Sequence, residues 1–132
     1  MKKFLVAFFL IVLTTISVSA EVVRFRTTSY TSKQYTPYGW TEWRPYQDSD
    51  MLLTIDFDND IVTIYSPKTQ VYKIISYEGS GIDYDGDAVA EFRFVDQDRD
   101  RGTMRLVQRR SGKSEIYISF ANVSWCYSVV RL

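Results

Sequence analysis

Apolar and polar residues alternate along most of the chain after its first twenty positions. Val23, Phe25 and Thr27 alternate with Arg24 and Arg26. The same period of two recurs over six further stretches, at residues 53–57, 61–66, 71–78, 88–96, 103–110 and 115–123, and the tail 124–132 is a candidate for one more strand. This period, with many β-branched and aromatic residues, is typical of half-buried strands, and no segment has the helical period of 3.6. The pattern therefore predicts an all-β protein of seven or eight strands.

Short runs of turn-forming residues separate these stretches, at residues 58–60, 67–69, 79–81, 98–102 and 111–113. Short connections join antiparallel neighbours, so a meander is the expected topology. A sheet with this many strands in so short a chain removes its edges best by closing on itself. We therefore expect a small closed antiparallel barrel of the lipocalin or streptavidin type, with a two-sheet sandwich as the alternative.

The first twenty residues have a different character. Lys2 and Lys3 precede an unbroken apolar run at residues 4–13, and Val18 and Ala20 are acceptable at the −3 and −1 positions of a signal-peptidase site. The run is shorter than the roughly 20 residues that a membrane-spanning helix needs. We expect residues 1–20 to be a cleaved signal peptide and residues 21–132 to form one exported domain, periplasmic or extracellular.

Two features of the composition limit the function. The two lysines lost with the signal peptide leave 16 − 2 = 14 basic residues against 16 acidic ones, so there is no overall positive field to attract nucleic acid. The chain has no histidine and a single cysteine, Cys126. A histidine-based triad, a histidine-ligated metal site and an intramolecular disulfide are thus excluded. We expect a protein that is not an enzyme and has no cofactor or metal. Arginines on the outer faces of the strands predict a mature chain that is not integral to a membrane.

The stretch "YTPYGWTEWRPY", residues 35–46, places five aromatic rings in twelve residues. Trp and Tyr combine a large apolar area with a polar group, which suits stacking on a ligand or partner. The same rings are equally suited to closing one end of a barrel, because Trp is heavily buried on average. One buried and one exposed Trp is the expected compromise. The candidate ligand- or partner-binding residues are Tyr35, Tyr38, Trp40, Trp43 and Tyr46.

Two acidic clusters have the spacing of a calcium loop, at Asp83, Asp85 and Asp87 and at Asp96, Asp98 and Asp100. In the first, Ala88 and Phe94 occupy the positions where an EF-hand requires Gly and Glu, so that motif is absent. Asp favours turns through local hydrogen bonds, and we expect both clusters to be hairpin turns.

Three other features have both a functional and a structural interpretation. Glu42 lies between two tryptophans and is a candidate catalytic acid, but a rim residue or a partner of Arg44 is the preferred interpretation. Cys126 is expected to be a small buried apolar residue of the last strand. A group of basic residues around one hairpin is a candidate docking surface for an acidic partner: Arg99, Arg101, Arg105, Arg109, Arg110 and Lys113.

The run "WTEWRPYQDSDMLLTIDFDNDIVTIYSPKTQVYKI", followed later by "DYDGD" and "MRLV", resembles short exported proteins of the Bacteroidetes type. The shared features are a W-x-x-W stretch, an I-D-x-D-N-D hairpin and a YS-x-x-x-Q-V-Y strand pair. The resemblance covers most of the mature chain and implies a bacterial signal peptide. It implies no activity and no binding residues.

Together these patterns predict an exported, non-enzymatic binding module of the bacterial cell envelope. The first hypothesis is a small apolar or sugar-like ligand bound at a barrel mouth that Trp40, Trp43 and nearby tyrosines line. The alternative is a protein-binding module, such as an inhibitor of an extracytoplasmic hydrolase, with the aromatic stretch as its interface.

Overall fold

The computed structural model describes residues 22–132, so the signal peptide predicted for residues 1–20 lies outside the described residues. These residues form strands only: β1 (Val22–Thr36), β2 (Gly39–Trp40), β3 (Gln47–Asp48), β4 (Leu52–Asp56), β5 (Ile61–Ile64), β6 (Gln70–Ile82), β7 (Ala88–Val95), β8 (Arg101–Gln108), β9 (Ser114–Ser119) and β10 (Val123–Arg131). Within the same range no helix is long and apolar enough to cross a membrane.

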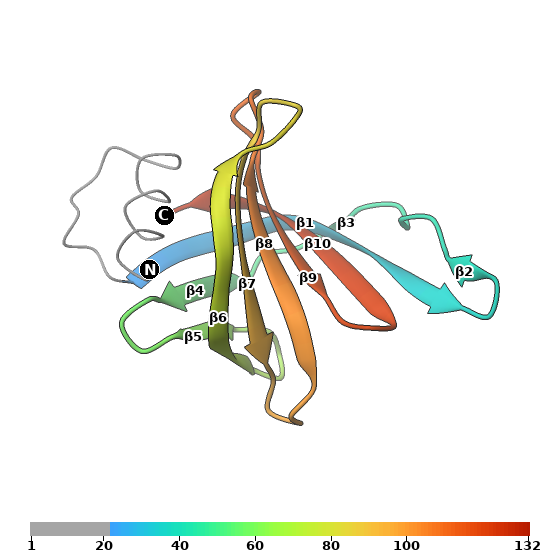
Figure 1. The fold of residues 1–132 in the computed structure, drawn as a ribbon, viewed down its shortest axis with the longest axis horizontal. Helices are drawn as coiled ribbons and strands as arrows, with labels where there is room; N and C mark the ends of the chain where they lie inside the picture. The colour runs from blue at the N-terminus through green and yellow to red at the C-terminus, as the bar shows by residue number, and fades with distance from the viewer. Residues whose placement is uncertain (1–21) are drawn as a thin grey trace.

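The eight longer strands form a closed antiparallel barrel (Figure 1). The order around the barrel is β1, β4, β5, β6, β7, β8, β9 and β10, and the pairing of β10 with β1 closes it. β2 and β3 are two-residue strands that pair with the second half of β1. The predicted barrel is confirmed, because the meander of short turns leaves β1 and β10 as the two edges and these edges pair with each other.

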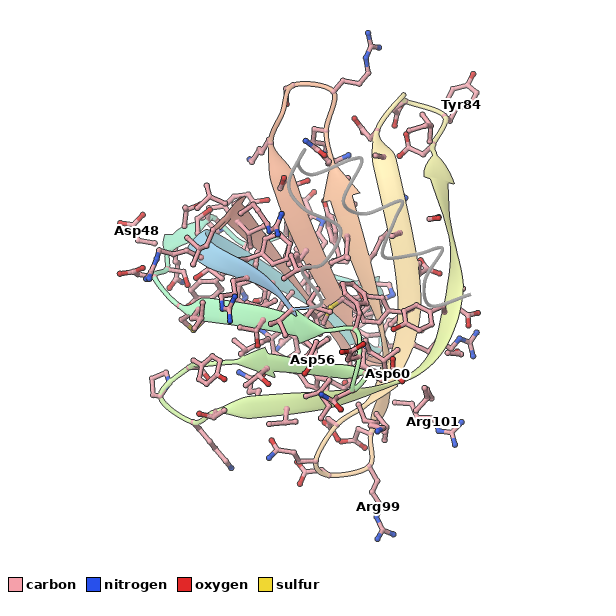
Figure 2. The ribbon with its side chains drawn as sticks, turned by 90° about the vertical axis from the view of Figure 1, so that its left-hand side faces the viewer. Asp48, Asp56, Asp60, Tyr84, Arg99 and Arg101 are labelled. Carbon is pink, nitrogen blue, oxygen red and sulfur yellow. The ribbon has the colours of Figure 1, made fainter. Side chains whose placement is uncertain are left out.

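The turns define two ends of the barrel (Figure 2). The turns at residues 83–87 and 109–113 lie at one end, which we call the Tyr84 end. The turns at residues 65–69, 96–100 and 120–122 lie at the other, which we call the Arg99 end. β1 and β10 run antiparallel to each other, and in Figure 1 they run crosswise to β6, β7 and β8.

Alternate residues of the eight barrel strands fill the interior. The largest side chains that are fully buried include Phe25, Phe57, Phe92 and Phe94. At the Arg99 end a series of rings continues the core towards solvent. Its ring centroids are 4.6 Å apart for Tyr72 and Phe94 and 5.4 Å apart for Phe94 and Phe120. The Arg99 end of the interior is therefore packed with aromatic side chains.

Three boundaries differ from the sequence prediction. β6 continues through Gly79 and Gly81, and the hairpin turn follows at residues 83–87. Gly79, with a φ of 129°, lies at a register shift next to Tyr77, so it serves a β-bulge instead of ending the strand. β1 continues to Thr36, nine residues beyond the predicted end at Thr27, because β10 pairs along its second half. The stretch predicted as one strand at residues 115–123 is divided by a turn at residues 120–122.

Candidate binding surface

Residues 37–51 connect β1 to β4, and the part of this connection at residues 37–48, which we call the strap, runs beside the second half of β1. Its backbone amides donate hydrogen bonds to β1: that of Thr41 to the Gln34 carbonyl at 2.8 Å, and that of Arg44 to the Ser32 carbonyl at 3.0 Å. The Thr31 hydroxyl donates to the Arg44 carbonyl. Although it contains little regular strand, the strap is held along its length by β1.

The strap begins with a tight hairpin between β1 and β2. Thr36 lies opposite Gly39, and its hydroxyl donates to the Gly39 carbonyl at 2.8 Å and accepts from the Tyr38 amide at 3.2 Å. Gly39 has a φ of 106°, a conformation in which a Cβ would be strained. Tyr38 is 100% exposed at the tip. In Figure 1 this hairpin projects beyond the barrel.

Stacked and charged contacts hold the other rings. Tyr35 and Trp40 lie opposite each other and meet edge to face, with centroids 5.5 Å apart. The Lys33 ammonium lies 5.3 Å from the Trp40 ring and 4.7 Å from the Trp43 ring, which places one cation between two indoles. Such cation–π contacts stabilise by about 0.5–1 kcal/mol each at exposed sites. The rings are therefore ordered while they remain accessible.

All five predicted aromatic residues are exposed. Trp40 and Trp43 are 44% and 39% exposed, so the expectation that one of the two would be buried is wrong. Their position also differs from the predicted barrel mouth. Trp43 meets Tyr117 of β9 at 6.0 Å, on the outer face of the sheet, and Tyr46 reaches Cys126 of β10 on the same face. The structure brings the five residues together on the outside of β1, β10 and β9 because the strap folds over that face.

A polar cluster that the sequence did not predict lies on this outer face near the strap. Arg109 donates to Glu115 from Nε at 2.7 Å, to Asp87 from Nη1 at 3.0 Å and to the Tyr117 hydroxyl from Nη2 at 2.9 Å. Glu115 and Asp87 are buried on a face that alternation makes an outward one. The residues come from two hairpins, β6–β7 and β8–β9, and only their buried outward positions, once the fold is known, identify them.

The strap reaches this cluster through Tyr46 and Cys126. The Tyr46 hydroxyl lies 3.8 Å from the Cys126 sulfur, which lies 4.0 Å from Glu115 Oε2. Burial and the contact with Cys126 raise the pKa of Tyr46 to about 12. Burial also raises the pKa of the Cys126 thiol. Cys126 is buried as predicted, and its pKa moves in the opposite direction from that of an activated nucleophile.

Charged partners favour the ionised forms of Arg109 and Asp87. Burial acts to lower the pKa of Arg109, but its hydrogen bonds to Asp87 and Glu115 outweigh burial and raise it. The Arg110 amide and the Arg109 guanidinium lower the pKa of Asp87. Both shifts favour the charged forms of Arg109 and Asp87, so this ion pair fixes the outer face beside the strap.

The Arg99 end carries a separate cleft of about 330 Å³. Tyr72, Phe120 and Trp125 form its aromatic wall, and Ser66, Gln70 and the 96–98 turn supply polar groups. The tryptophan that lines this cleft is Trp125, whereas the sequence predicted Trp40 and Trp43 at the barrel mouth. The sequence pattern that could have predicted this position is the alternation of Trp125 with Tyr127 and Val129, which places Trp125 on the inner face next to the last turn.

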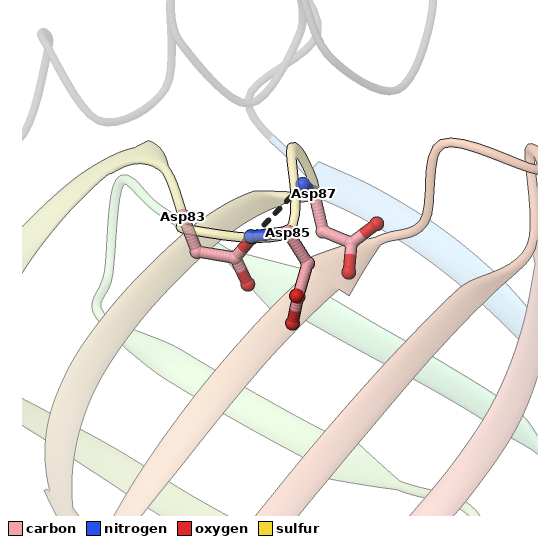
Figure 3. A group of neighbouring side chains, drawn as sticks. All are labelled: Asp83, Asp85 and Asp87. Carbon is pink, nitrogen blue, oxygen red and sulfur yellow. Dashed lines mark hydrogen bonds between the residues drawn. The ribbon is translucent and has the colours of Figure 1, made fainter.

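Both acidic clusters lie in hairpin turns, as predicted. Asp83 Oδ1 accepts the backbone amides of Asp85 and Asp87, each at 2.9 Å (Figure 3). Asp96 accepts the amides of Asp98 and Asp100 in the same way. The carboxylates of the first cluster lie within 4.8 Å of one another, but Asp87 is already engaged by Arg109. The clusters are explained by turn formation.

The predicted basic surface is divided. Arg99 and Arg101 lie at the Arg99 end in Figure 2, whereas Arg109 is part of the polar cluster near the Tyr84 end. Because β8 spans the barrel between them, these residues do not form one patch. Glu42 is exposed on the strap.

No protein-family model, curated protein or solved structure matches the chain. The resemblance to short exported Bacteroidetes-type proteins therefore stays a prediction.

Proposed function

We propose that the mature chain is a non-enzymatic, exported protein-binding module whose strap inserts into a concave site on an extracytoplasmic partner, such as the active-site cleft of a hydrolase. The observation that carries this proposal is the ordered, projecting hairpin with a fully exposed Tyr38 at its tip. Sites for small molecules are concave. A projecting aromatic tip is complementary to a concave partner.

The neighbouring residues support the same mode of binding. Trp, Tyr and Arg dominate the energetic centres of protein interfaces, and the strap offers Tyr38, Trp40, Trp43 and Arg44 within a short distance along the chain. Contiguous exposed apolar area is a mark of interaction surfaces. The backbone hydrogen bonds to β1 fix the strap before binding, which reduces the entropy lost on association.

A photo-crosslinking experiment tests the proposal. Benzoylphenylalanine replaces Tyr38 in one sample of the mature chain and Tyr84 in another. Tyr84 is the matched control because it is equally exposed at a turn tip, but at the other end of the barrel. We expect a discrete adduct from position 38 in an envelope extract of the producing organism. Wild-type protein should compete with it, and the Trp40→Ala/Trp43→Ala variant should not. Equal labelling from both positions, or no adduct from position 38, would contradict the proposal.

A second candidate is a sugar-like ligand in the cleft at the Arg99 end. Its volume of about 330 Å³ lies at the lower limit of small-ligand pockets, and Trp125 offers a ring for stacking. In a Trp40→Phe/Trp43→Phe variant, Trp125 is the only remaining tryptophan. Titration with monosaccharides and disaccharides should change its fluorescence in a saturable way. A linear response to every sugar would rule this candidate out.

A further inference from the structure

An open groove of about 500 Å³ crosses the outer face of β1, β4, β5 and β6. It extends from Arg24 on β1 to Lys73 on β6, and the turn between β4 and β5 borders it. Asp56, labelled in Figure 2, lies at that border. The groove shares no residue with the strap or with the cleft at the Arg99 end. It is therefore a separate surface, and a ligand bound there does not depend on the proposed partner binding.

The register of the strands fixes which side chains meet in the groove. Thr54 of β4 lies directly opposite Thr63 of β5, and Arg24 of β1 lies opposite Thr54 from the other side. Lys73 of β6 lies opposite Ile61, two residues before Thr63. The sequence neighbours of the two threonines and of the two cations are buried in the core, so these four side chains point outward. Opposite residues have Cβ atoms about 4.5–5.5 Å apart, so one ligand can reach both threonines.

The polar groups along the groove are available to a ligand. Among residues 22–132, the exposed side chains of Arg24 and Lys73 form no ion pair, and the hydroxyls of Thr54 and Thr63 form no hydrogen bond. Asp56 differs, because its Oδ1 accepts two backbone amides of the following turn at 3.0 and 3.1 Å. This face thus offers two cations and two hydroxyls for binding, while its carboxylate is engaged in the turn.

An exposed ring forms one side of the groove. Tyr65 is 50% exposed, and its backbone amide donates to the Leu52 carbonyl at 2.9 Å, which continues the pairing of β5 with β4. Its backbone is therefore fixed while its ring stays accessible. A tyrosine ring combines a large apolar face with a polar end. A sugar ring is complementary to such a surface, because it has an apolar face and a rim of hydroxyls.

We infer that this groove binds a segment of an anionic polysaccharide that lies across the strands. A sugar ring stacks on Tyr65, and its hydroxyls bond to Thr54 and Thr63. Acidic groups of neighbouring sugars pair with Arg24 and Lys73 through charge-assisted hydrogen bonds. Because β1 and β6 are three strand spacings apart, about 14 Å, the two cations suit the repeated charge of a polymer better than one small anion. Charge complementarity thus favours an acidic glycan over a neutral one.

Three oligosaccharides test the assignment on the mature chain by isothermal titration calorimetry at low salt. Hexagalacturonate carries carboxylates, its full methyl ester is the uncharged match, and sulfated maltohexaose carries sulfate esters. We expect saturable binding of at least one anionic probe with a dissociation constant of about 1 mM or below, and the tighter probe identifies the acidic group. The methyl ester should bind about tenfold more weakly or worse, because it loses the contacts to both cations.

Matched variants locate the site, and all the side chains they change are exposed, so the fold should be kept. Arg24→Gln/Lys73→Gln should weaken binding of the anionic probe about tenfold or more. Arg99→Gln/Arg101→Gln removes the same charge at the Arg99 end and should leave binding within about twofold of the wild type. Tyr65→Ala should weaken binding several-fold, whereas Tyr65→Phe should retain it, because the ring makes the contact.

Three results would overturn the inference. One is the absence of saturable binding of both anionic probes up to about 10 mM, on the order of ten times the expected constant. Another is a methyl ester that binds as tightly as hexagalacturonate, because the cations would then contribute nothing. The third is a groove variant, Arg24→Gln/Lys73→Gln, that binds no more weakly than the control variant, since attraction would then arise from overall charge.

Discussion

Glu115 is the residue of the polar cluster whose replacement should cost the most stability. Its side chain is 7% exposed, and its Oε1 accepts from Arg109 Nε at 2.7 Å and from the Tyr117 hydroxyl at 3.3 Å and pairs with Arg109 Nη2 at 2.7 Å. Glu115→Gln keeps the shape but replaces the charge with an amide. Hydrogen bonds to charged groups contribute about 1.5–3 kcal/mol. Asp87 still neutralises Arg109, so the loss should stay below the roughly 3–5 kcal/mol of a fully broken buried pair. We expect a loss of about 2 kcal/mol.

Urea denaturation at pH 7, followed by tryptophan fluorescence, measures this loss. Glu78→Gln is the matched control, because Glu78 pairs with Arg93 at 3.5 Å in an exposed setting. Exposed ion pairs contribute about 0–1 kcal/mol, so this control should unfold close to the wild type. If Glu115→Gln unfolds with a free energy within about 0.5 kcal/mol of the control, the cluster does not support the fold and the reasoning is refuted.

Three other outcomes are expected. Gly102→Ala should lower the free energy of unfolding by about 1–3 kcal/mol in the same urea assay, because a Cβ there would lie 2.5 Å from the Phe94 ring and 2.7 Å from the Ser119 carbonyl oxygen. Gly81→Ala is the control, because a Cβ at that position meets open space, and it should leave the stability unchanged. Equal urea midpoints for the two variants would contradict this prediction. Cys126 should react slowly with Ellman's reagent at pH 8 in the native protein and faster in Tyr46→Ala, which removes its cover; fast labelling of the wild type would disprove it. The free energy of unfolding should fall as the pH drops below about 4, because the pKa of Asp87 is lower in the folded than in the unfolded chain. Asp87→Asn should make this decline shallower in acid titrations of stability. An unchanged slope in the variant would count against the prediction.

Much of the fold could be predicted because its determinants are local. Alternation along β4, β7 and β9 assigns each residue to a face, and short turns restrict neighbouring strands to antiparallel pairing. The glycines at positions 79 and 81 misled the prediction, because a glycine has the same local signature in a turn and in a bulge. Which of the two it serves depends on the register with β7.

The candidate surfaces were predicted less completely. The residues of the strap were identified correctly as an aromatic cluster, but its position on the outer face depends on the long pairing of β1 with β10. Arg109, Glu115 and Asp87 carry no sequence motif, since each looks like an ordinary outward-facing charge. Arg24 and Lys73 each look like an ordinary solvated charge until the pairing of β4 with β1 and of β5 with β6 places both beside one groove.

The sequence by itself determined the all-β class, the antiparallel meander and the exclusion of histidine chemistry, because periodicity and composition are properties of neighbouring residues. Only the tertiary structure decided which aromatic residues face solvent and which acids lose their exposure. Closure of the barrel sets these outcomes, because it brings β10 against β1 and lays the strap over β9 and β10. Contacts between segments so distant in the chain leave no local pattern in the sequence.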